Sequence, residues 1–207
     1  MRRLLLLSLS LLSASVASLA QTVEAQEQEF VRVYVVPMHD FPEQIAEEVA
    51  RFLTADMKFQ VRSTLRLGDL GIQPMPGTQQ LSADQILDQS ASTVRRFPEA
   101  GPKTYFLLLT GYDINTSSRR TRFVFSWHSS AYNSSVLSVA RLLEFQGNEP
   151  KVDSRFCDRL FKMSKRAIGE LHLGWKRSND PQDVMYSPIM SLDDLDRLSM
   201  IHRADPK

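Results

Sequence analysis

The sequence has little cysteine, since Cys157 is the only one among its 207 residues. A single cysteine excludes an intramolecular disulfide, so the core must stabilise the fold. Charge of one sign is lacking as well, because 25 Lys and Arg residues stand against 24 Asp and Glu residues. This balance argues against nucleic acid as a partner, and the short basic run at 119–122 is interpreted as a solvated loop.

Long hydrophobic runs are absent after residue 20, so no membrane span is expected beyond that point. Before it, two arginines precede Leu4–Leu12, which holds seven leucines in nine residues, and small residues follow up to Ala20. This pattern is typical of a secretory signal peptide cleaved before Gln21, with an uncleaved anchor as the alternative. The sequence therefore predicts an exported protein, periplasmic or extracellular, with a signal peptide at 1–20, a flexible segment at 21–29 and one domain at 30–207.

The domain opens with strand and helix patterns. The run 31–37 is rich in β-branched residues and predicts a buried strand. A helix should follow, because the apolar residues of 45–53 fall on one face, and Asp40 with Glu43 is expected to form its capping box. The alternating run 59–65 then predicts a second strand.

Strands and helices continue to alternate along the rest of the chain. The order predicts an α/β (α+β) single domain with a mixed, twisted sheet of four to five strands and covering helices. The expected elements are a loop at 68–77, a helix opened by Ser82, a central strand at 104–110, an edge strand at 123–127 paired with a strand at 135–142, a long helix at 154–173, a turn at 184–187 and a final helix capped by Ser191.

Several blocks of the sequence resemble the archaemetzincin family of zinc peptidases, and their order and spacing are more specific than any one block. The resemblance spans roughly residues 31 to 203. It implies a metzincin-like domain in which 154–173 is an active-site-like helix and Met185 lies in a methionine turn. The blocks that carry it are 33–42, 79–87, 110–114, 123–125 and 137–142.

The zinc motif of that family is degenerate in this chain. The resemblance implies H-E-x-x-H-x-x-G-x-x-H, whose histidines hold zinc while the glutamate handles the proton of bound water. Two residues are missing before Gly174, whose distance to Met185 keeps the family's spacing. The resulting assignments are Gly169 at the first histidine, Glu170 at the catalytic glutamate, Arg177 at the third histidine, and Ser178, Asp183, Arg203 and Pro206 at the four cysteines of a structural zinc site.

The remaining residues could bind zinc only in a rebuilt site. His172 is the one histidine of the long helix, and its neighbours three and four positions away are not ligands. Glu170 is two positions from it, about 200° around a helix, so the two cannot face one metal unless the helix ends between them. His172 is interpreted as a helix-end residue, and a new zinc site would need distant side chains such as His39, His128, His202 or Asp183.

Two functions follow from this degenerate motif. The favoured one is a catalytically inactive metallopeptidase homologue, a pseudoenzyme that binds a peptide or protein segment in its cleft and needs no cofactor. The alternative is an active zinc-dependent peptidase with a rebuilt site, with Glu170 as base and His172 as a metal ligand. Substrate would lie along the edge strand at 123–127 as an added strand. The oligomeric state and the substrate stay open.

Overall fold

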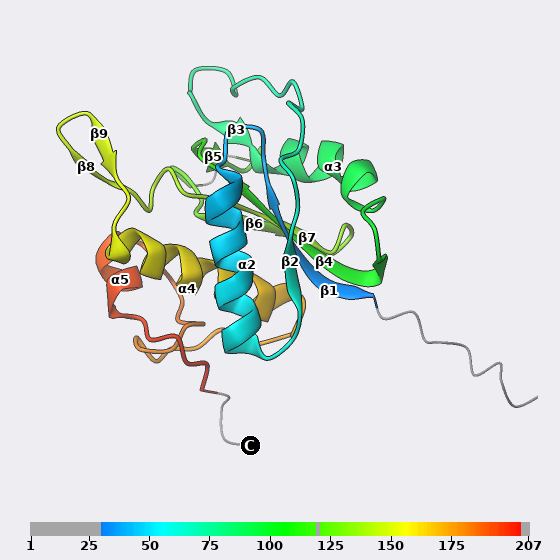
Figure 1. The fold of residues 1–207 in the computed structure, drawn as a ribbon. Coiled ribbons are helices and arrows are strands. Elements are labelled where there is room, and N and C mark those ends of the chain that lie inside the picture. The colour runs from blue at the N-terminus through cyan, green and yellow to red at the C-terminus, as the bar shows by residue number, and fades with distance from the viewer. Residues whose placement is uncertain (1–29, 119–120, 204–207) are drawn as a thin grey trace, which may run out of the picture.

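The computed structural model describes residues 30–118 and 121–203 (Figure 1). The predicted signal peptide at 1–20, the predicted flexible segment at 21–29 and Pro206 lie outside the described residues. Within the described part, no helix combines the length and the apolar character that crossing a membrane requires.

One mixed sheet of five strands organises the domain. Its strand order confirms the prediction of a mixed sheet of four to five strands with 104–110 at the centre. All neighbours are parallel except the last pair, which forms an antiparallel hairpin. In spatial order the strands are β2 (Val61–Ser63), β1 (Val31–Pro37), β4 (Ala100–Thr110), β7 (Ser134–Ser138) and β6 (Ser126–Ser129).

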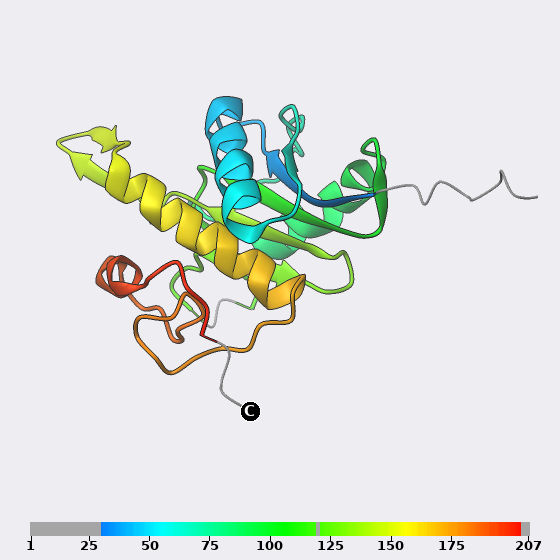
Figure 2. The ribbon, with the colours of Figure 1, turned by 60° about the horizontal axis from the view of Figure 1, so that its bottom comes forward.

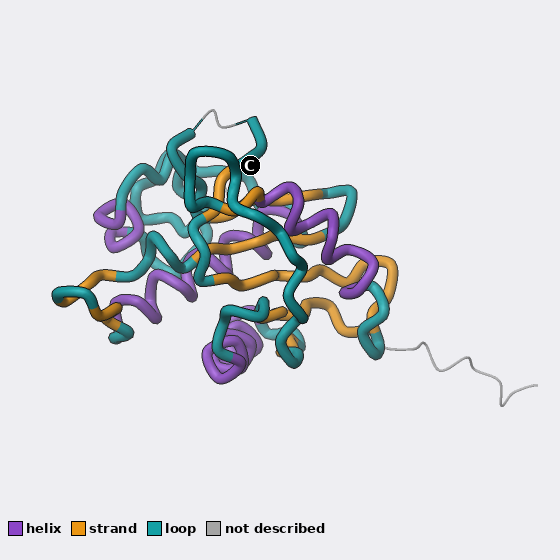
Figure 3. Tube along the Cα trace, turned by 90° about the horizontal axis from the view of Figure 1, so that it is seen from above, coloured by secondary structure: helices purple, strands orange, loops and turns teal. Residues whose placement is uncertain are grey.

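Helices cover both faces of this sheet. On one face, α2 (Glu43–Met57) and α4 (Ser154–Leu171) pack on Val33, Tyr105 and Leu107. On the other face, α3 (Ala83–Val94) packs against a separate core cluster. Figure 3 shows α2 and α3 on opposite sides of the strands. Because side chains alternate along a strand, both faces of β1 and β4 are apolar, as is expected of parallel strands buried on both sides.

Two small pairs of strands and a short helix complete the fold. The sequence patterns did not predict either pair, because the strands are too short to show alternation. The hairpin of β8 and β9 projects beyond the N-terminal end of α4 (Figure 1). These elements are β3 (Leu81–Ser82) with β5 (Ile114–Asn115), β8 (Glu144–Gln146) with β9 (Glu149–Lys151), and α5 (Leu192–Arg197).

The predicted helix starts are partly correct. Ser82 caps α3 by accepting from the Gln85 N–H at 3.3 Å, and α5 has the expected capping box at its start. The capping box predicted for Asp40 with Glu43 is wrong, because α2 begins after Pro42 with no side-chain cap. The Asp40 carboxylate instead accepts hydrogen bonds from the end of β4, where the tight turn leaves backbone N–H groups to satisfy.

The predicted strand boundaries need correction at four places. The central strand β4 begins at Ala100 rather than at residue 104. The second strand is only Val61–Ser63, shorter than 59–65. The edge strand begins at Ser126 rather than at residue 123, because the Phe125 side chain turns into the core between sheet and α4. Its partner β7 ends at Ser138, and Val139 begins a turn by accepting the Leu142 N–H at 2.9 Å.

Candidate functional site

The long helix α4 carries the positions that the resemblance assigns to the active site. Asp153 caps its start by accepting from the Phe156 N–H at 3.0 Å, and His172 stands at its C-cap. Gly174, with φ of +68°, then reverses the chain, a backbone conformation that suits glycine. Figure 2 shows the segment after α4 returning along that helix, on the side away from α2.

The indole of Trp175 lies directly on Gly169. The Trp175 N–H donates to the Gly169 carbonyl at 2.8 Å, and a Cβ added to Gly169 would come within 2.1 Å of the indole Cε3. On its far side the indole stacks on His202, with ring centroids 4.7 Å apart. The space over the position of the first family histidine is therefore filled by an aromatic side chain.

Glu170 forms an ion pair with Arg177. Its Oε1 accepts from Arg177 Nη2 at 2.7 Å, and Arg177 also donates to the Ser187 hydroxyl at 3.1 Å. Its Oε2 lies 3.8 Å from His128 Nε2 and accepts no hydrogen bond. The residue that the resemblance assigns to the catalytic glutamate thus pairs with the residue that it assigns to the third histidine.

A chain of hydroxyl groups continues from His128 into the sheet. The Tyr105 hydroxyl donates to Ser135 Oγ, which lies 2.5 Å from His128 Nδ1. Together with Glu170 this order resembles a serine, histidine and acid triad, but Ser135 has no exposed surface, so no substrate can reach it. Tyr105 is completely buried too, and burial raises the pKa of its phenol. The chain is a buried polar network that joins β4, β7 and the edge strand.

Burial sets the charge of this network. Burial lowers the pKa of His128, while the Glu170 carboxylate opposes that shift and Arg177 and Arg166 add to it, so the ring is neutral at pH 7. Burial also lowers the pKa of Arg166, to about 10, a value at which the guanidinium stays charged near pH 7. Two guanidinium groups and one carboxylate therefore surround a neutral imidazole.

The four histidines do not converge. His128 is close to Glu170 and His202 to Asp183, while His39 lies 3.9 Å from Asp69. His172 packs against the rings of Phe59 and Tyr105, and burial, with Arg32 nearby, lowers its pKa. Over 30–118 and 121–203, no three His, Cys, Asp or Glu side chains come together. Zinc sites in proteins use at least three such ligands, so these donors do not fit the ion.

The roles predicted for Glu170 and His172 stay predictions. α4 ends at Leu171, between the two, so the helix itself no longer forces them apart. Their side chains nevertheless have different neighbours, since Glu170 faces His128 and Arg177 while His172 faces aromatic rings. The sequence did not lead us to predict that Trp175 packs on Gly169. The signal for it was a bulky residue directly after Gly174, where a helix-ending glycine turns the chain back.

Positions assigned to lost family cysteines hold the segment after α4 together. Asp183 has no exposed surface and accepts from the N–H groups of Met185 and Arg203, both at 2.7 Å, and from His202 Nδ1 at 3.1 Å. Ser178 donates its N–H to the Met185 carbonyl at 3.0 Å. Met185 is buried in a turn closed by the Tyr186 N–H and the Asp183 carbonyl. Hydrogen bonds therefore connect three of these positions, Ser178, Asp183 and Arg203, through the turn.

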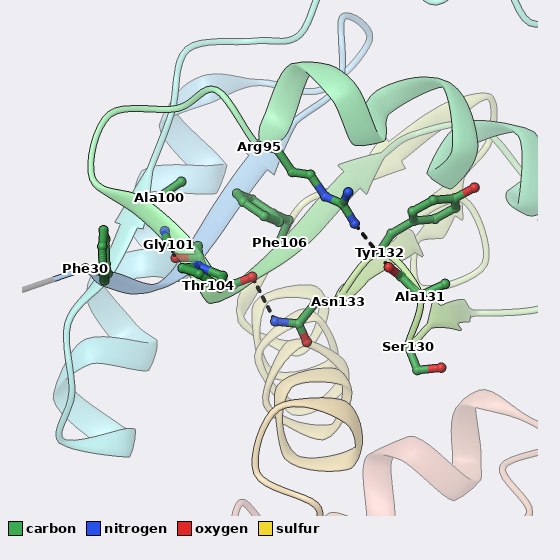
Figure 4. A pocket seen from close by; sticks show the side chains of 11 residues that line it. Phe30, Arg95, Ala100, Gly101, Thr104, Phe106, Ser130, Ala131, Tyr132 and Asn133 are labelled. Carbon is green, nitrogen blue, oxygen red and sulfur yellow. Dashed lines mark hydrogen bonds between the residues drawn. The ribbon is translucent and has the colours of Figure 1, made fainter.

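A large hollow lies at the start of β4, where Ala100, Thr104 and Phe106 line it. It has a volume of about 580 Å³ (Figure 4). Its polar groups are engaged within the protein, since Arg95 donates to the Ala131 carbonyl at 3.1 Å and Asn133 to the Thr104 carbonyl at 2.8 Å. This hollow therefore offers a ligand few free hydrogen-bonding groups.

Gly169→Ala is expected to expel Trp175 from its place. The new methyl group cannot coexist with the indole at 2.1 Å, and the contact is with a rigid ring. Overpacking of this kind costs about 1–3 kcal/mol, more than the gain of about 1 kcal/mol that alanine brings to a helix interior. The measurement is tryptophan fluorescence together with urea unfolding.

Ala167→Gly on the same helix is the control for helix propensity. Its methyl group lies in the core against the sheet rather than under Trp175, so it should destabilise the chain without moving the indole emission. A G169A protein with unchanged emission and unchanged stability would contradict the packing of Trp175 on Gly169.

Comparison with known proteins supports the fold. No protein-family model and no curated protein sequence matches the chain. Among solved structures, it is similar to a zinc-dependent peptidase from Methanocorpusculum labreanum, with a TM-score of 0.69 and 22% identity over 83% of this chain and 95% of that one. The archaemetzincin from Archaeoglobus fulgidus, solved with malonate, gives 0.62 and 23% over 84% and 96%.

A third structure has the same fold. It is the archaemetzincin from Methanopyrus kandleri, with a TM-score of 0.61 and 20% identity over 87% of this chain and 92% of that one. Three alignments over nearly the whole of each known chain confirm the resemblance at the level of the fold. The chain has the fold of the archaemetzincin-type zinc peptidases.

Proposed function

We propose that this chain is an exported, archaemetzincin-like protein that lacks peptidase activity and binds a peptide segment. The observation that carries the proposal is the packing of Trp175 on Gly169, the position of the first family histidine. The Glu170–Arg177 ion pair supports it, because it joins two further positions of the motif. In the described part of the chain, His128 and Glu170 have no third donor beside them, so a zinc ion placed there would lack a protein ligand.

The free edge of the sheet supports peptide binding. Among residues 30–118 and 121–203, β6 pairs with β7 alone, so its other side offers backbone N–H and C=O groups for an added strand. A peptide on this edge would pass close to His128, whose neighbour is Glu170. Trp127 in the same strand is held by a hydrogen bond from its Nε1 to Asp84 Oδ1 at 2.8 Å. The edge strand is therefore anchored on the rest of the fold.

The zinc content of the chain that starts at Gln21 tests the proposal. We expect well under one zinc per ten chains after dialysis, because the donors do not form a site of three ligands. Elemental mass spectrometry gives the content, and incubation with a mixture of peptides gives the activity. The M. labreanum zinc-dependent peptidase, prepared in parallel, is the positive control for both.

One zinc per chain, with peptide cleavage that a chelator stops, would overturn the proposal and establish the rebuilt site. Binding has its own readout, which is hydrogen exchange of the β6 amides in the presence of the peptide mixture. Slower exchange at Ser126–Ser129 supports an added strand, while unchanged exchange throughout the titration contradicts it.

A further inference from the structure

A second hollow lies at the carboxyl ends of β1 and β4. The chain leaves β1 into α2 on one face of the sheet and enters β4 from α3 on the other face. In parallel α/β sheets this reversal of direction opens a crevice outside the strand ends, where ligands commonly bind. Here the crevice has a volume of about 300 Å³, and residues 69–74 of the long loop that precedes β3 line it. Figure 1 shows the course of this loop.

The walls of this hollow are mostly apolar and well anchored. At its base Met38 is 1% exposed. The loop is tied at its two ends, since the Leu67 N–H donates to the Pro37 carbonyl at 2.8 Å and the Met75 N–H to the Gln80 carbonyl at 2.9 Å. The apolar lining residues are Met38, Leu70, Ile72, Pro74 and Leu81.

The Asp40 carboxylate fixes the rim on the β4 side. It accepts from the N–H groups of Gly111 and Tyr112, at 2.6 and 3.2 Å, and from the Thr110 hydroxyl. The Tyr112 ring is thereby placed beside His39, with centroids 5.7 Å apart and the hydroxyl 3.4 Å from Nε2. Two aromatic rings and a hydroxyl group therefore stand at the mouth of the hollow.

Two hydrogen-bonding atoms of the hollow lie near each other, His39 Nδ1 and Asp69 Oδ1. His39 Nδ1 is enclosed, has no hydrogen-bond partner among the residues that the structure describes, and lies 3.9 Å from Asp69 Oδ1. This is too far for a direct bond, but a nitrogen between the two atoms could donate to both at ordinary distances. Asp69 stands on the loop with 71% of its side chain exposed, so a small outward movement of its carboxylate admits such a donor.

The charge of the lining residues favours a hydrogen-bond donor that is a cation. Asp69 is the only carboxylate among the lining residues, and the lining contains no lysine or arginine. A tyrosine ring, here that of Tyr112, can also attract a cation through its face. A ligand that fits this lining carries a positive charge, donates two or more hydrogen bonds and has an apolar part. A primary ammonium group attached to an apolar body has all three properties.

We propose that the hollow between His39, Asp69 and Tyr112 binds small primary amines with an apolar or aromatic body. The ammonium donates to Asp69 and His39, and the apolar body lies against Leu70, Ile72 and their neighbours. The site is independent of the residues around Glu170, because His128, Trp175 and Arg177 do not line it.

Titration with phenethylamine, followed by amide NMR spectra at pH 8, tests this site. We expect saturable shifts at Gly71, Gln79 and Tyr112, with half-saturation in the millimolar range that suits so small a ligand. The matched probe 3-phenylpropionate has the same ring and a carboxylate in place of the ammonium. It should bind at least about tenfold more weakly, because Asp69 repels it.

Asp69→Asn is the decisive variant. Asparagine keeps the turn in which this side chain accepts from the Gly71 N–H at 2.8 Å, so the loop is retained. Losing the charge should weaken phenethylamine binding about fivefold or more. Glu149→Gln, in the exposed strand β9, is the control and should leave the affinity unchanged. Equal affinity for the two probes, equal affinity of D69N and the parent chain, or no shift at these amides at 20 mM phenethylamine would each overturn the proposal.

Discussion

Replacing Arg159 by alanine is expected to lower the free energy of unfolding by about 2–4 kcal/mol, because it removes a buried side chain and the hydrogen bonds that it donates. The Arg159 side chain is only 2% exposed. It donates to both oxygens of Asp196 at 2.7 Å, to Glu144 at 2.7 Å and to the Leu142 carbonyl at 3.1 Å. Without the guanidinium, the Asp196 carboxylate and the Leu142 carbonyl lose their partner beneath α5 and the segment before β8.

Two further variants separate charge from packing. Arg155 lies one turn earlier on α4, reaches the same Glu144 at 3.2 Å and is 60% exposed, so Arg155→Ala should cost less than about 1 kcal/mol. Arg159→Met keeps much of the buried volume but leaves Asp196 unpaired, so its cost should lie between the other two. Urea unfolding of the three variants gives the order, and an Arg159→Ala cost near that of Arg155→Ala would refute the structural role of this side chain.

The sequence was sufficient for the frame of the fold. The β-branched run at 31–37 and the apolar run at 104–110 identify strands that are buried on both faces, since only such strands are continuously apolar. Ser82 and Ser191 mark the starts of α3 and α5 by local chemistry, which acts within three residues and needs no tertiary partner.

Other features depend on contacts that a linear pattern does not contain. Asp40 is followed three residues later by Glu43 and satisfies the capping-box pattern, yet its carboxylate binds N–H groups more than seventy residues away. β8 and β9 are three residues each and largely exposed, so they show no hydrophobic period. Local rules fail here because a distant partner competes with the local one or because no face is buried.

In the candidate site, too, some features follow from the sequence and others depend on contacts between distant residues. The assignment of Gly169 and Arg177 to positions of zinc-binding histidines is implied by the resemblance and its spacing to Met185, and it stays a prediction. What replaces the ligands was not visible, since Trp175 reaches Gly169 only after the chain reverses at Gly174. The meeting of His128 with Glu170 likewise requires the edge strand to lie against α4.

Asp183→Ala is expected to be the second strongly destabilising substitution, with a loss of about 3–5 kcal/mol in unfolding free energy. Burial by itself raises the pKa of this carboxyl, but the N–H groups of Met185 and Arg203 and the His202 ring outweigh burial and hold the pKa below its usual range. The ionised form is therefore the one that the fold stabilises. Asp183→Asn should cost less, since an amide oxygen can still accept one or two of these bonds.

The sign of the pH dependence follows from that lowered pKa. A carboxyl whose pKa is lower in the folded state stabilises the fold above its unfolded value, near 4, and loses that contribution as the pH falls through the folded value. The difference in stability between the parent chain and Asp183→Ala should therefore shrink as the pH falls below about 4. Urea unfolding of both proteins at several pH values measures it.

The control for Asp183 is Asp180→Ala in the same segment. Asp180 pairs with the Arg203 side chain at 2.8 Å, but that guanidinium is 56% exposed, so the loss should stay below about 1 kcal/mol. If Asp183→Ala were as mild as this control, hydrogen bonds would not be what holds the turn at Met185. If the large loss is observed without any added metal, a buried carboxylate with three donors stabilises a segment for which the resemblance implies a zinc ion and four cysteines.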